Sequence, residues 1–311
     1  MSADHPLRSV LYVPGEKARA LEKARGLDVD ALIIDLEDSI APEMKPQARE
    51  SACRTIAAGG YGFRQLALRV NPRGSAWFAD DLKAAAAARP DIVVLPKVES
   101  PEDLAEASRR LDDAGAPPDL ALWAMIETPL GLLNLREIAQ AGVGAGAGGR
   151  LAALVLGTND IAKDTGVQPG GDRAALVPWL LQAVLVARAY GLRVFDGVYN
   201  AFSDLEGFTR ECTQGRRLGF DGKTLIHPSQ ITSANRVFAP APEDVAQARA
   251  IVDAFARPEN AEKGVITLGG QMVERLHAQS AARLLALDAA IRARESSPGD
   301  KPAARPASAG A

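Results

Sequence analysis

Eight short runs of apolar, often β-branched residues recur along the chain, and segments with helical patterns separate them. Within each run the apolar residues are nearly continuous, which is typical of strands buried on both faces of a parallel sheet. Eight such strands alternating with helices favour a (β/α)8 TIM barrel of the α/β class. A doubly wound open sheet is the alternative, because alternation does not reveal closure. The runs cover residues 7–13, 31–36, 65–70, 91–97, 120–126, 151–156, 192–198 and 223–226.

Cap residues mark where helices begin between these runs. Ser100 precedes a proline and two acidic residues, and Thr128 precedes Pro129, so each is expected to cap a helix N-terminus. After the eighth run, residues 242–255 and 275–293 have amphipathic helical patterns. We therefore expect a TIM barrel over 1–240, a C-terminal helical extension over 241–295, and a disordered tail rich in Pro, Ala and Ser over 296–311.

The composition argues against several classes of protein. Acidic residues outnumber basic ones, 39 against 36, and the formal charge of -3 disfavours a general binder of nucleic acid or anionic membranes. Cys53 and Cys212 are far apart in the sequence, so neither a disulfide framework nor a zinc ribbon is expected. The 3 histidines form no i, i+4 pair, which disfavours a multi-histidine metal site. The sequence contains no apolar signal segment and no run of membrane-spanning length, so a cytoplasmic location is expected.

Ionisable and amide side chains gather at the ends of the predicted strands. In a barrel the carboxyl ends of the strands meet on the face that carries catalysis, so these side chains form a convergent set. The alternative is that each one only caps the following helix. That alternative is weaker for Arg69 and Glu127, because each follows an apolar run where an unpaired charge is costly to bury. The set consists of Asp35, Glu37, Asp38, Arg69, Asn71, Lys97, Glu127, Asn159, Asp160, Asp196 and His227.

Glu127 and Asp160 form a candidate ligand pair for a hard cation. Mg²⁺ is often held by one or two carboxylates, with water and substrate oxygens completing its coordination. Softer metals have little to bind in a chain with few histidines and two separated cysteines. The alternative is that Asp160 belongs to a polar cap for a helix starting near Ile161.

A glycine pattern at Gly144, Gly146 and Gly149 matches G-x-G-x-x-G. It follows a predicted helix and precedes a strand, which is the reverse of the order in dinucleotide-binding folds, so we interpret it as a flexible Gly/Ala loop. Neither a P-loop nor a G-x-S-x-G motif occurs in the chain, which argues against a P-loop ATPase and an α/β-hydrolase.

Seven blocks of the sequence, taken together and in order, resemble the citrate lyase β-subunit-like branch of the HpcH/HpaI aldolases, which includes malyl-CoA and citramalyl-CoA lyases. The resemblance extends over residues 8–287 and implies a TIM barrel, Mg²⁺ dependence and an acyl-CoA substrate. It also implies a trimer or hexamer in which the C-terminal segment reaches a neighbour's active site. The blocks are RSVLYVPGEKARALEKA, ALIIDLEDSIAPEMKPQAR, LRVNPRG, LPKVES, AMIETPLGLLN, VLGTNDIAKD and LGFDGKTLIHPSQI.

The resemblance implies roles for individual residues. The substrate-binding arginine falls on Arg69, and the two metal carboxylates fall on Glu127 and Asp160. Lys23 and Lys17 match basic positions near the CoA. Asp35, Glu37, Asp38, Lys97 and Asp196 are candidates for supporting this site.

The family's catalytic aspartate lies in a late G-x-M-[IV]-D motif. The matching stretch here, 270–274, ends in Glu274, so the acid is one methylene longer. In the reaction that the resemblance implies, Arg69 would offset the charge on a carboxylate or enolate oxygen. Glu274 would protonate the enolate, and it would remove a proton from acetyl-CoA in the reverse direction.

The leading hypothesis is a Mg²⁺-dependent carbon–carbon lyase that cleaves a malyl-, methylmalyl- or citramalyl-type CoA thioester into a 2-oxo acid and an acyl-CoA. Hydrolysis of the thioester is a second hypothesis. A third is a citrate lyase β-like subunit that acts on a carrier-bound acyl group only within a complex. A Schiff base on Lys97, as in class I aldolases, is a minor alternative.

Overall fold

The computed structural model describes residues 5–144, 149–260 and 262–296. The chain divides into two compact units, Leu7–Phe238 and a second unit formed chiefly by Ala239–Lys301. The predicted Gly/Ala loop and the predicted C-terminal tail fall almost entirely outside the described residues.

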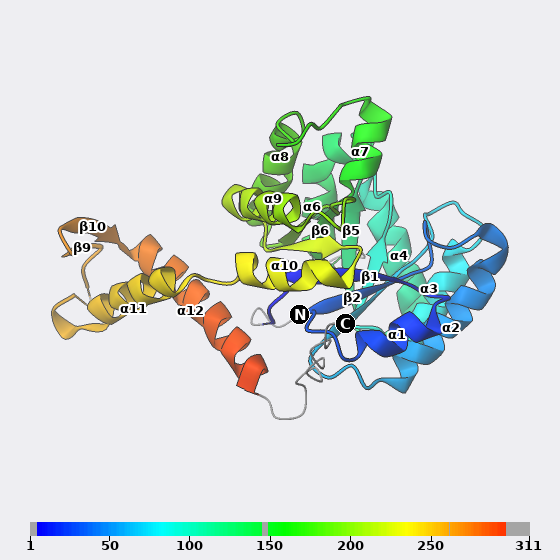
Figure 1. Ribbon diagram of the computed structural model, residues 1–311, viewed down its shortest axis with the longest axis horizontal. Helices are drawn as coiled ribbons and strands as arrows, with labels where there is room; N and C mark the ends of the chain where they lie inside the picture. The colour runs from blue at the N-terminus through cyan, green and yellow to red at the C-terminus, as the bar shows by residue number, and fades with distance from the viewer. Residues whose placement is uncertain (1–4, 145–148, 261, 297–311) are drawn as a thin grey trace, which may run out of the picture. The chain divides into compact units, whose positions relative to one another are not determined.

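The first unit is a closed barrel of eight parallel strands, which confirms the predicted TIM barrel (Figure 1). Hydrogen-bonded pairing between the first and last strands closes the sheet, and this excludes the open-sheet alternative. The strands are β1 (Ser9–Pro14), β2 (Ala31–Asp35), β3 (Gln65–Arg69), β4 (Ile92–Leu95), β5 (Ala121–Ile126), β6 (Leu151–Leu156), β7 (Arg193–Asp196) and β8 (Gly222–Leu225).

Helices follow the strands and form the outer layer of the barrel. A short 3₁₀ turn (Pro42–Met44) precedes the second helix, and another (Pro228–Gln230) follows β8. The helices are α1 (Ala18–Ala24), α2 (Lys45–Ala58), α3 (Phe78–Ala88), α4 (Pro101–Asp113), α5 (Pro129–Leu133), α6 (Leu135–Val143), α7 (Thr158–Thr165), α8 (Val177–Ala189), α9 (Leu205–Leu218) and α10 (Ile231–Phe238).

The predicted caps explain where two of these helices begin. Ser100 caps α4 in a capping box with Asp103, and Thr128 caps α5 by accepting a hydrogen bond from the Gly131 amide at 3.1 Å. The segment after Thr128 is divided at Asn134 into two helices.

The interior of the barrel is filled by apolar side chains from alternate strand positions. Trp123 and Phe195, both fully buried, pack with their ring centroids 4.7 Å apart. Val10, Ile33 and Ala67 belong to the same cluster. These three residues lie on β1, β2 and β3. On each of these strands the next inward-pointing side chain is two residues further along, and it lies nearer the carboxyl-end face. This packed layer therefore forms the floor beneath the carboxyl-end face.

The second unit contains two helices and a β-hairpin. The helices α11 (Pro242–Ala256) and α12 (Arg275–Ser296) match the two predicted segments closely. The hairpin, which the sequence interpretation did not include, pairs β9 (Val265–Leu268) with β10 (Gln271–Glu274). Gly269 and Gly270 form its turn with φ of 57° and 79°, left-handed values that glycine adopts without a steric penalty.

A buried charge cluster ties β7 and β8 to α9. The Lys223 ammonium lies 2.8 Å from an Asp196 oxygen and 2.8 Å from Glu211, and it donates to the Gly197 carbonyl. Arg173 pairs with the other Asp196 oxygen at 2.8 Å. Lys223 and Asp196 have no exposed side-chain surface, so each charge depends on its partners for solvation.

We predict that Lys223→Met lowers the free energy of unfolding by about 3 kcal/mol, since loss of one partner leaves buried carboxylates undercompensated. Urea denaturation followed by circular dichroism measures this change. The matched control is Lys83→Met, at an exposed lysine of α3, and its stability should differ little from that of the unmodified chain. Equal stability of the two variants would show that the cluster contributes nothing net.

Candidate active site

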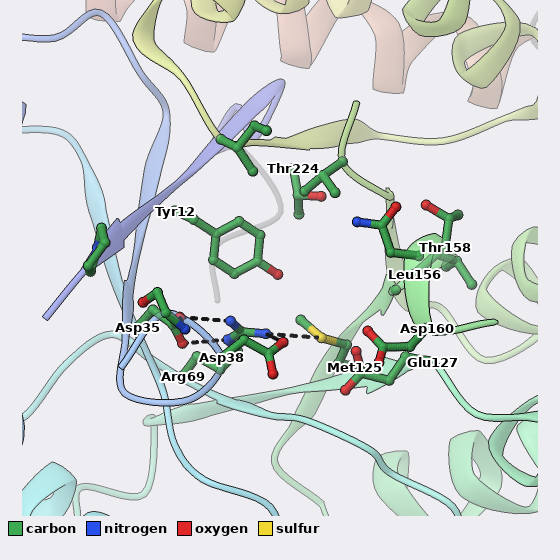
Figure 2. A pocket seen from close by; sticks show the side chains of 16 residues that line it. Tyr12, Asp35, Asp38, Arg69, Met125, Glu127, Leu156, Thr158, Asp160 and Thr224 are labelled. Atoms are coloured by element: carbon green, nitrogen blue, oxygen red, sulfur yellow. Dashed lines mark hydrogen bonds and ion pairs between the residues drawn. The ribbon is translucent and has the colours of Figure 1, made fainter. Parts of the chain in front are cut away.

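A cavity of about 360 Å³ opens at the carboxyl-end face of the barrel. Its lining comes from the ends of β1, β2, β3, β5, β6 and β8, from residues that follow β2, β5, β6, β7 and β8, and from the first turn of α7 (Figure 2). This is where TIM barrels carry their catalytic residues. The lining residues are Tyr12, Pro14, Asp35, Asp38, Ser39, Arg69, Met125, Glu127, Leu156, Gly157, Thr158, Asn159, Asp160, Val198, Thr224 and Ile226.

Arg69 and Asp35 form a bidentate ion pair in the wall of the pocket. They are direct neighbours in the β2–β3 register, and Arg69 donates from Nε at 2.6 Å and from Nη2 at 2.8 Å to the two carboxylate oxygens. Burial acts to raise the pKa of Asp35, but the adjacent guanidinium lowers it overall. Both groups are therefore held in their charged forms.

Two further carboxylates, those of Glu37 and Asp38, lie close to the Arg69 guanidinium. Its Nη1 lies 2.8 Å from a Glu37 oxygen, in an ion pair without hydrogen-bond geometry, and 3.3 Å from Asp38. The Glu37 side chain is buried, whereas 59% of the Asp38 side chain is exposed. Because the guanidinium is shared among three carboxylates, the wall of the pocket around it is negative overall.

Tyr12 covers the guanidinium and turns its hydroxyl into the pocket (Figure 2). The Arg69 guanidinium carbon lies 4.9 Å from the centre of the Tyr12 ring, a cation–π arrangement. Burial raises the pKa of Tyr12, and nearby acids add to that effect although Arg69 opposes it. The phenol therefore stays protonated and can donate a hydrogen bond.

Glu127 follows β5 and is 1% exposed. Its Oε1 accepts a hydrogen bond from the Lys97 backbone amide at 2.8 Å. A side chain at Gly157 would clash with the Glu127 carboxyl group, so the glycine leaves the space that this carboxyl occupies. Burial raises the pKa of Glu127 to about 7. Glu37 and Asp160 act in the same direction, and the charges of Lys97 and Arg69 oppose them.

Asp160 lies in the first turn of α7, which begins at Thr158 with Gly157 as its N-cap residue. Asp160 is therefore inside the helix, and the alternative of a cap for a helix starting near Ile161 is wrong. Figure 2 shows the Glu127 and Asp160 carboxylates next to each other on one side of the pocket.

These two carboxylates fit a divalent cation that needs further ligands from outside the chain. Within the described ranges, no group of three or more His, Cys, Asp and Glu side chains is arranged to hold a metal ion. Mg²⁺ is suited to such a two-carboxylate site because it retains several water or substrate oxygens.

Lys97 supports Glu127 from outside the pocket lining. Its backbone has a φ of 52°, a left-handed value that is uncommon for a residue other than glycine. Its ammonium lies 3.2 Å from Glu37 and 3.7 Å from Glu127. Burial would lower the pKa of Lys97, but these carboxylates raise it overall. A Schiff base requires the neutral amine, so this environment disfavours the class I aldolase alternative.

Three other candidates, Asp196, Lys17 and Lys23, are not among the residues that line this pocket. Asp196 follows the inward-pointing Phe195 and so points outward, into the cluster with Lys223. Lys17 precedes α1 and Lys23 lies in its last turn, and both are exposed. Glu274 ends β10 in the second unit, where its amide donates to His277 Nδ1 at 2.9 Å.

The sequence interpretation missed several lining residues. Tyr12 and Met125 belong to apolar runs, where an aromatic or a methionine is indistinguishable from core. Thr224 lies on β8, and Thr158 begins α7. Strand alternation could have identified Tyr12 and Met125, because they point the same way as Val10 and Trp123 on their strands.

Among the residues that the structure describes, no helix has the length and apolar character needed to cross a membrane.

Comparison with known proteins places these residues in a family. Residues 8–228 match the family described as HpcH/HpaI aldolase/citrate lyase. A (3S)-malyl-CoA thioesterase of Cereibacter sphaeroides is 47% identical, over 93% of this chain and 97% of its own. The mitochondrial citramalyl-CoA lyase of Homo sapiens is 32% identical, over 86% of this chain and 82% of its own.

A solved structure shows the same architecture. Protein CitE from Mycobacterium tuberculosis, in complex with magnesium, acetoacetate and coenzyme A, has a TM-score of 0.70 and is 27% identical. The likeness covers 90% of this chain and 97% of that one. These matches confirm the resemblance seen in the seven sequence blocks: the chain belongs to the HpcH/HpaI aldolase/citrate lyase family.

Proposed function

We propose that this chain is a Mg²⁺-dependent enzyme that hydrolyses a malyl-CoA-type thioester, a CoA ester of a short 3-hydroxy dicarboxylic acid. One observation carries the proposal: the Glu127 and Asp160 carboxylates lie next to each other in a pocket that the Arg69 guanidinium also lines. The 47% identity to a malyl-CoA thioesterase supports hydrolysis over the carbon–carbon cleavage favoured by the sequence blocks.

Glu127 and Asp160 would hold the Mg²⁺ ion. When bound, the ion would supply positive charge that orients substrate oxygens and lowers the pKa of a hydroxyl group or water. The ion would also offset the net negative charge of the pocket wall, so that Arg69, fixed by Asp35, could bind a substrate carboxylate. Tyr12 can donate its phenolic proton in a hydrogen bond to a substrate oxygen, because its hydroxyl faces the pocket.

In hydrolysis, a water oxygen bonds to the thioester carbonyl carbon, the carbon–sulfur bond breaks, and the CoA sulfur takes a proton. The products are the free hydroxy acid and CoA. Thr158, Asp160 and Thr224 line the pocket, and their oxygens can hydrogen-bond a water molecule there.

Carbon–carbon cleavage is the second candidate, and the citramalyl-CoA lyase relative supports it. The hydroxyl would lose its proton, and the bond between its carbon and the carbon beside the thioester carbonyl would break. A 2-oxo acid and the enolate of an acyl-CoA would form, and the enolate would then take up a proton. The same cation and arginine serve both reactions, so the products decide between them.

The products formed from malyl-CoA by the purified chain distinguish these functions. We expect malate and free CoA in the presence of Mg²⁺, and no turnover when EDTA is present, because the carboxylate pair needs its cation. Liquid chromatography with mass detection identifies the products. Glyoxylate and acetyl-CoA would instead establish a lyase, and inactivity toward every CoA ester would support a subunit that requires a carrier-bound acyl group.

The metal affinity should depend on pH through Glu127. Mg²⁺ binds the carboxylate form, and the raised pKa of about 7 means that protons compete with the metal as the pH falls below that value. We expect Mg²⁺ binding to be about tenfold weaker at pH 6 than at pH 8, as measured by isothermal titration calorimetry.

The raised pKa of Glu127 also determines whether the metal-free chain becomes more or less stable as the pH rises. A carboxyl with a raised pKa in the folded state stabilises the metal-free chain at low pH, and this contribution is lost as the pH rises through about 7. Mg²⁺ should therefore raise the melting temperature more at pH 8 than at pH 6. Glu127→Gln is the control, because its weak residual binding should no longer depend on pH in this range.

We assign the proton transfer of either reaction to Glu274, which stands where the family motif has its aspartate. A positioned carboxyl group typically contributes 10²–10⁴-fold to such steps. Because Glu274 belongs to the second unit, this role requires that unit to reach a barrel pocket, its own or a neighbouring subunit's.

Glu274→Ala should therefore lower turnover about 100-fold or more without changing Mg²⁺ affinity, and Glu274→Asp should keep substantial activity. Steady-state kinetics and calorimetry measure the two effects. Glu259→Ala, at an exposed acid of the same unit, is the matched control. If neighbouring subunits share sites, mixing Glu274→Ala chains with Arg69→Ala chains should restore part of the activity. Normal turnover by Glu274→Ala would refute the assignment.

A further inference from the structure

Lys45, the first residue of α2, is a buried lysine whose ammonium group donates to three neutral oxygens in the described part of the chain. It is 7% exposed, and its Nζ donates to the Leu36 carbonyl at 3.1 Å, the Glu37 carbonyl at 2.9 Å and Asn71 Oδ1 at 2.6 Å. An ammonium has three protons, so its hydrogen-bonding capacity is fully used. Burying this charge is costly, and the hydrogen bonds recover only part of that cost.

The third acceptor is itself held by a buried network. Asn71 donates to Asp81 from its backbone amide at 2.9 Å and from its side chain at 2.7 Å. The other Asp81 oxygen accepts from Arg49 at 2.9 Å. Lys45 also lies 5.1 Å from the centre of the Trp77 ring. The ammonium is therefore fixed by elements of α2, α3 and the loop after β3.

The segment that Lys45 holds is the turn after β2, residues 36–39, which brings acids to the pocket. Asp35 accepts hydrogen bonds from the amides of Glu37 at 2.9 Å and Ser39 at 3.1 Å. The Lys45 ammonium donates to two backbone carbonyls of the same turn. The turn is thus fixed from both sides, with its amides bound by a carboxylate and its carbonyls by an ammonium.

This turn needs a cation because of the acids that it carries. Glu37 and Asp38 follow Asp35 within three residues, and all three carboxylates approach the single guanidinium of Arg69. Their mutual repulsion favours opening of the turn. The Lys45 ammonium opposes this repulsion at the backbone, without competing with Arg69 for a carboxylate.

We propose that Lys45 is a positioning residue: it holds the acidic turn closed so that Glu37 and Asp38 orient Arg69 and Lys97 for substrate and metal. The link to Lys97 is direct, because its ammonium lies 3.2 Å from Glu37 and 3.7 Å from Glu127. Lys45 is not one of the residues that line the pocket, so it acts through the turn. Its catalytic consequence rests on the proposed function.

Lys45→Met tests this role, because methionine fills a similar volume but donates no hydrogen bonds. Hydrogen–deuterium exchange of the metal-free protein should show at least about tenfold faster exchange at the amides of Glu37 and Ser39, and unchanged exchange in β5 and β6. With the proposed substrate, kcat should fall about tenfold or more, whereas KM should change little.

The matched control is Arg64→Met at the opposite end of β3. Arg64 is also a buried cation that donates to backbone carbonyls, those of Leu27 at 2.6 Å and Tyr61 at 3.0 Å. This variant should lose stability without loosening the 36–39 turn or changing kcat. If Lys45→Met does not fold, Asn71→Ala removes one of the three acceptors of Lys45, together with the side-chain hydrogen bond to Asp81, and should loosen the turn in the same direction, about fivefold.

The outcomes separate this inference from the proposed function. Wild-type exchange in the turn together with normal kcat in Lys45→Met would overturn the positioning role. The positioning role would also be overturned if Lys45→Met changed the exchange of the turn and kcat no more than Arg64→Met does. If the unmodified chain does not turn over malyl-CoA, the proposed function fails, and faster exchange in the turn of Lys45→Met still supports Lys45 as the residue that holds it closed.

Discussion

The Arg69–Asp35 ion pair is the interaction on which the charge balance of the pocket depends. It joins neighbouring positions of β2 and β3 at the carboxyl-end face, with both oxygens of the acid bound to the guanidinium. Truncating one partner of such a buried pair leaves the other charge uncompensated and costs far more than an exposed pair would. The pair also locates the acidic turn, since Asp35 binds two of its amides.

The remaining charges of the site follow from that pair. Among the described residues, five acids, two of them deeply buried around Arg69, face two cations at close range, Arg69 and Lys97. Glu127 is where this imbalance has its clearest effect, because burial and neighbouring acids make its ionisation unfavourable without a further positive charge. A divalent cation would restore the balance, and the resulting affinity comes from the whole cluster as well as from the two carboxylates that would touch the metal.

Much of this arrangement is predictable from the sequence, for a physical reason. Near-continuous apolar runs identify parallel strands, and charges directly after such runs, at Arg69 and Glu127, identify the active face. Tyr12 and Lys45 cannot be identified in this way, because an aromatic residue in an apolar run and a lysine at a helix start both have common structural explanations. Asp196 is expected near the pocket because it ends a strand, but the alternation along β7 turns its side chain outward. The Gly269-Gly270 pair between two short apolar stretches is the sequence signal of the hairpin.

The packed floor of the barrel determines from which side a ligand can enter the pocket. Trp123 and Phe195 fill the interior just beneath the cavity, with no exposed surface on either side chain. This packing closes the route through the middle of the barrel, so a ligand reaches the pocket from the carboxyl-end face and leaves by the same face. The aromatic pair thus sets the direction of entry without taking any part in the chemistry.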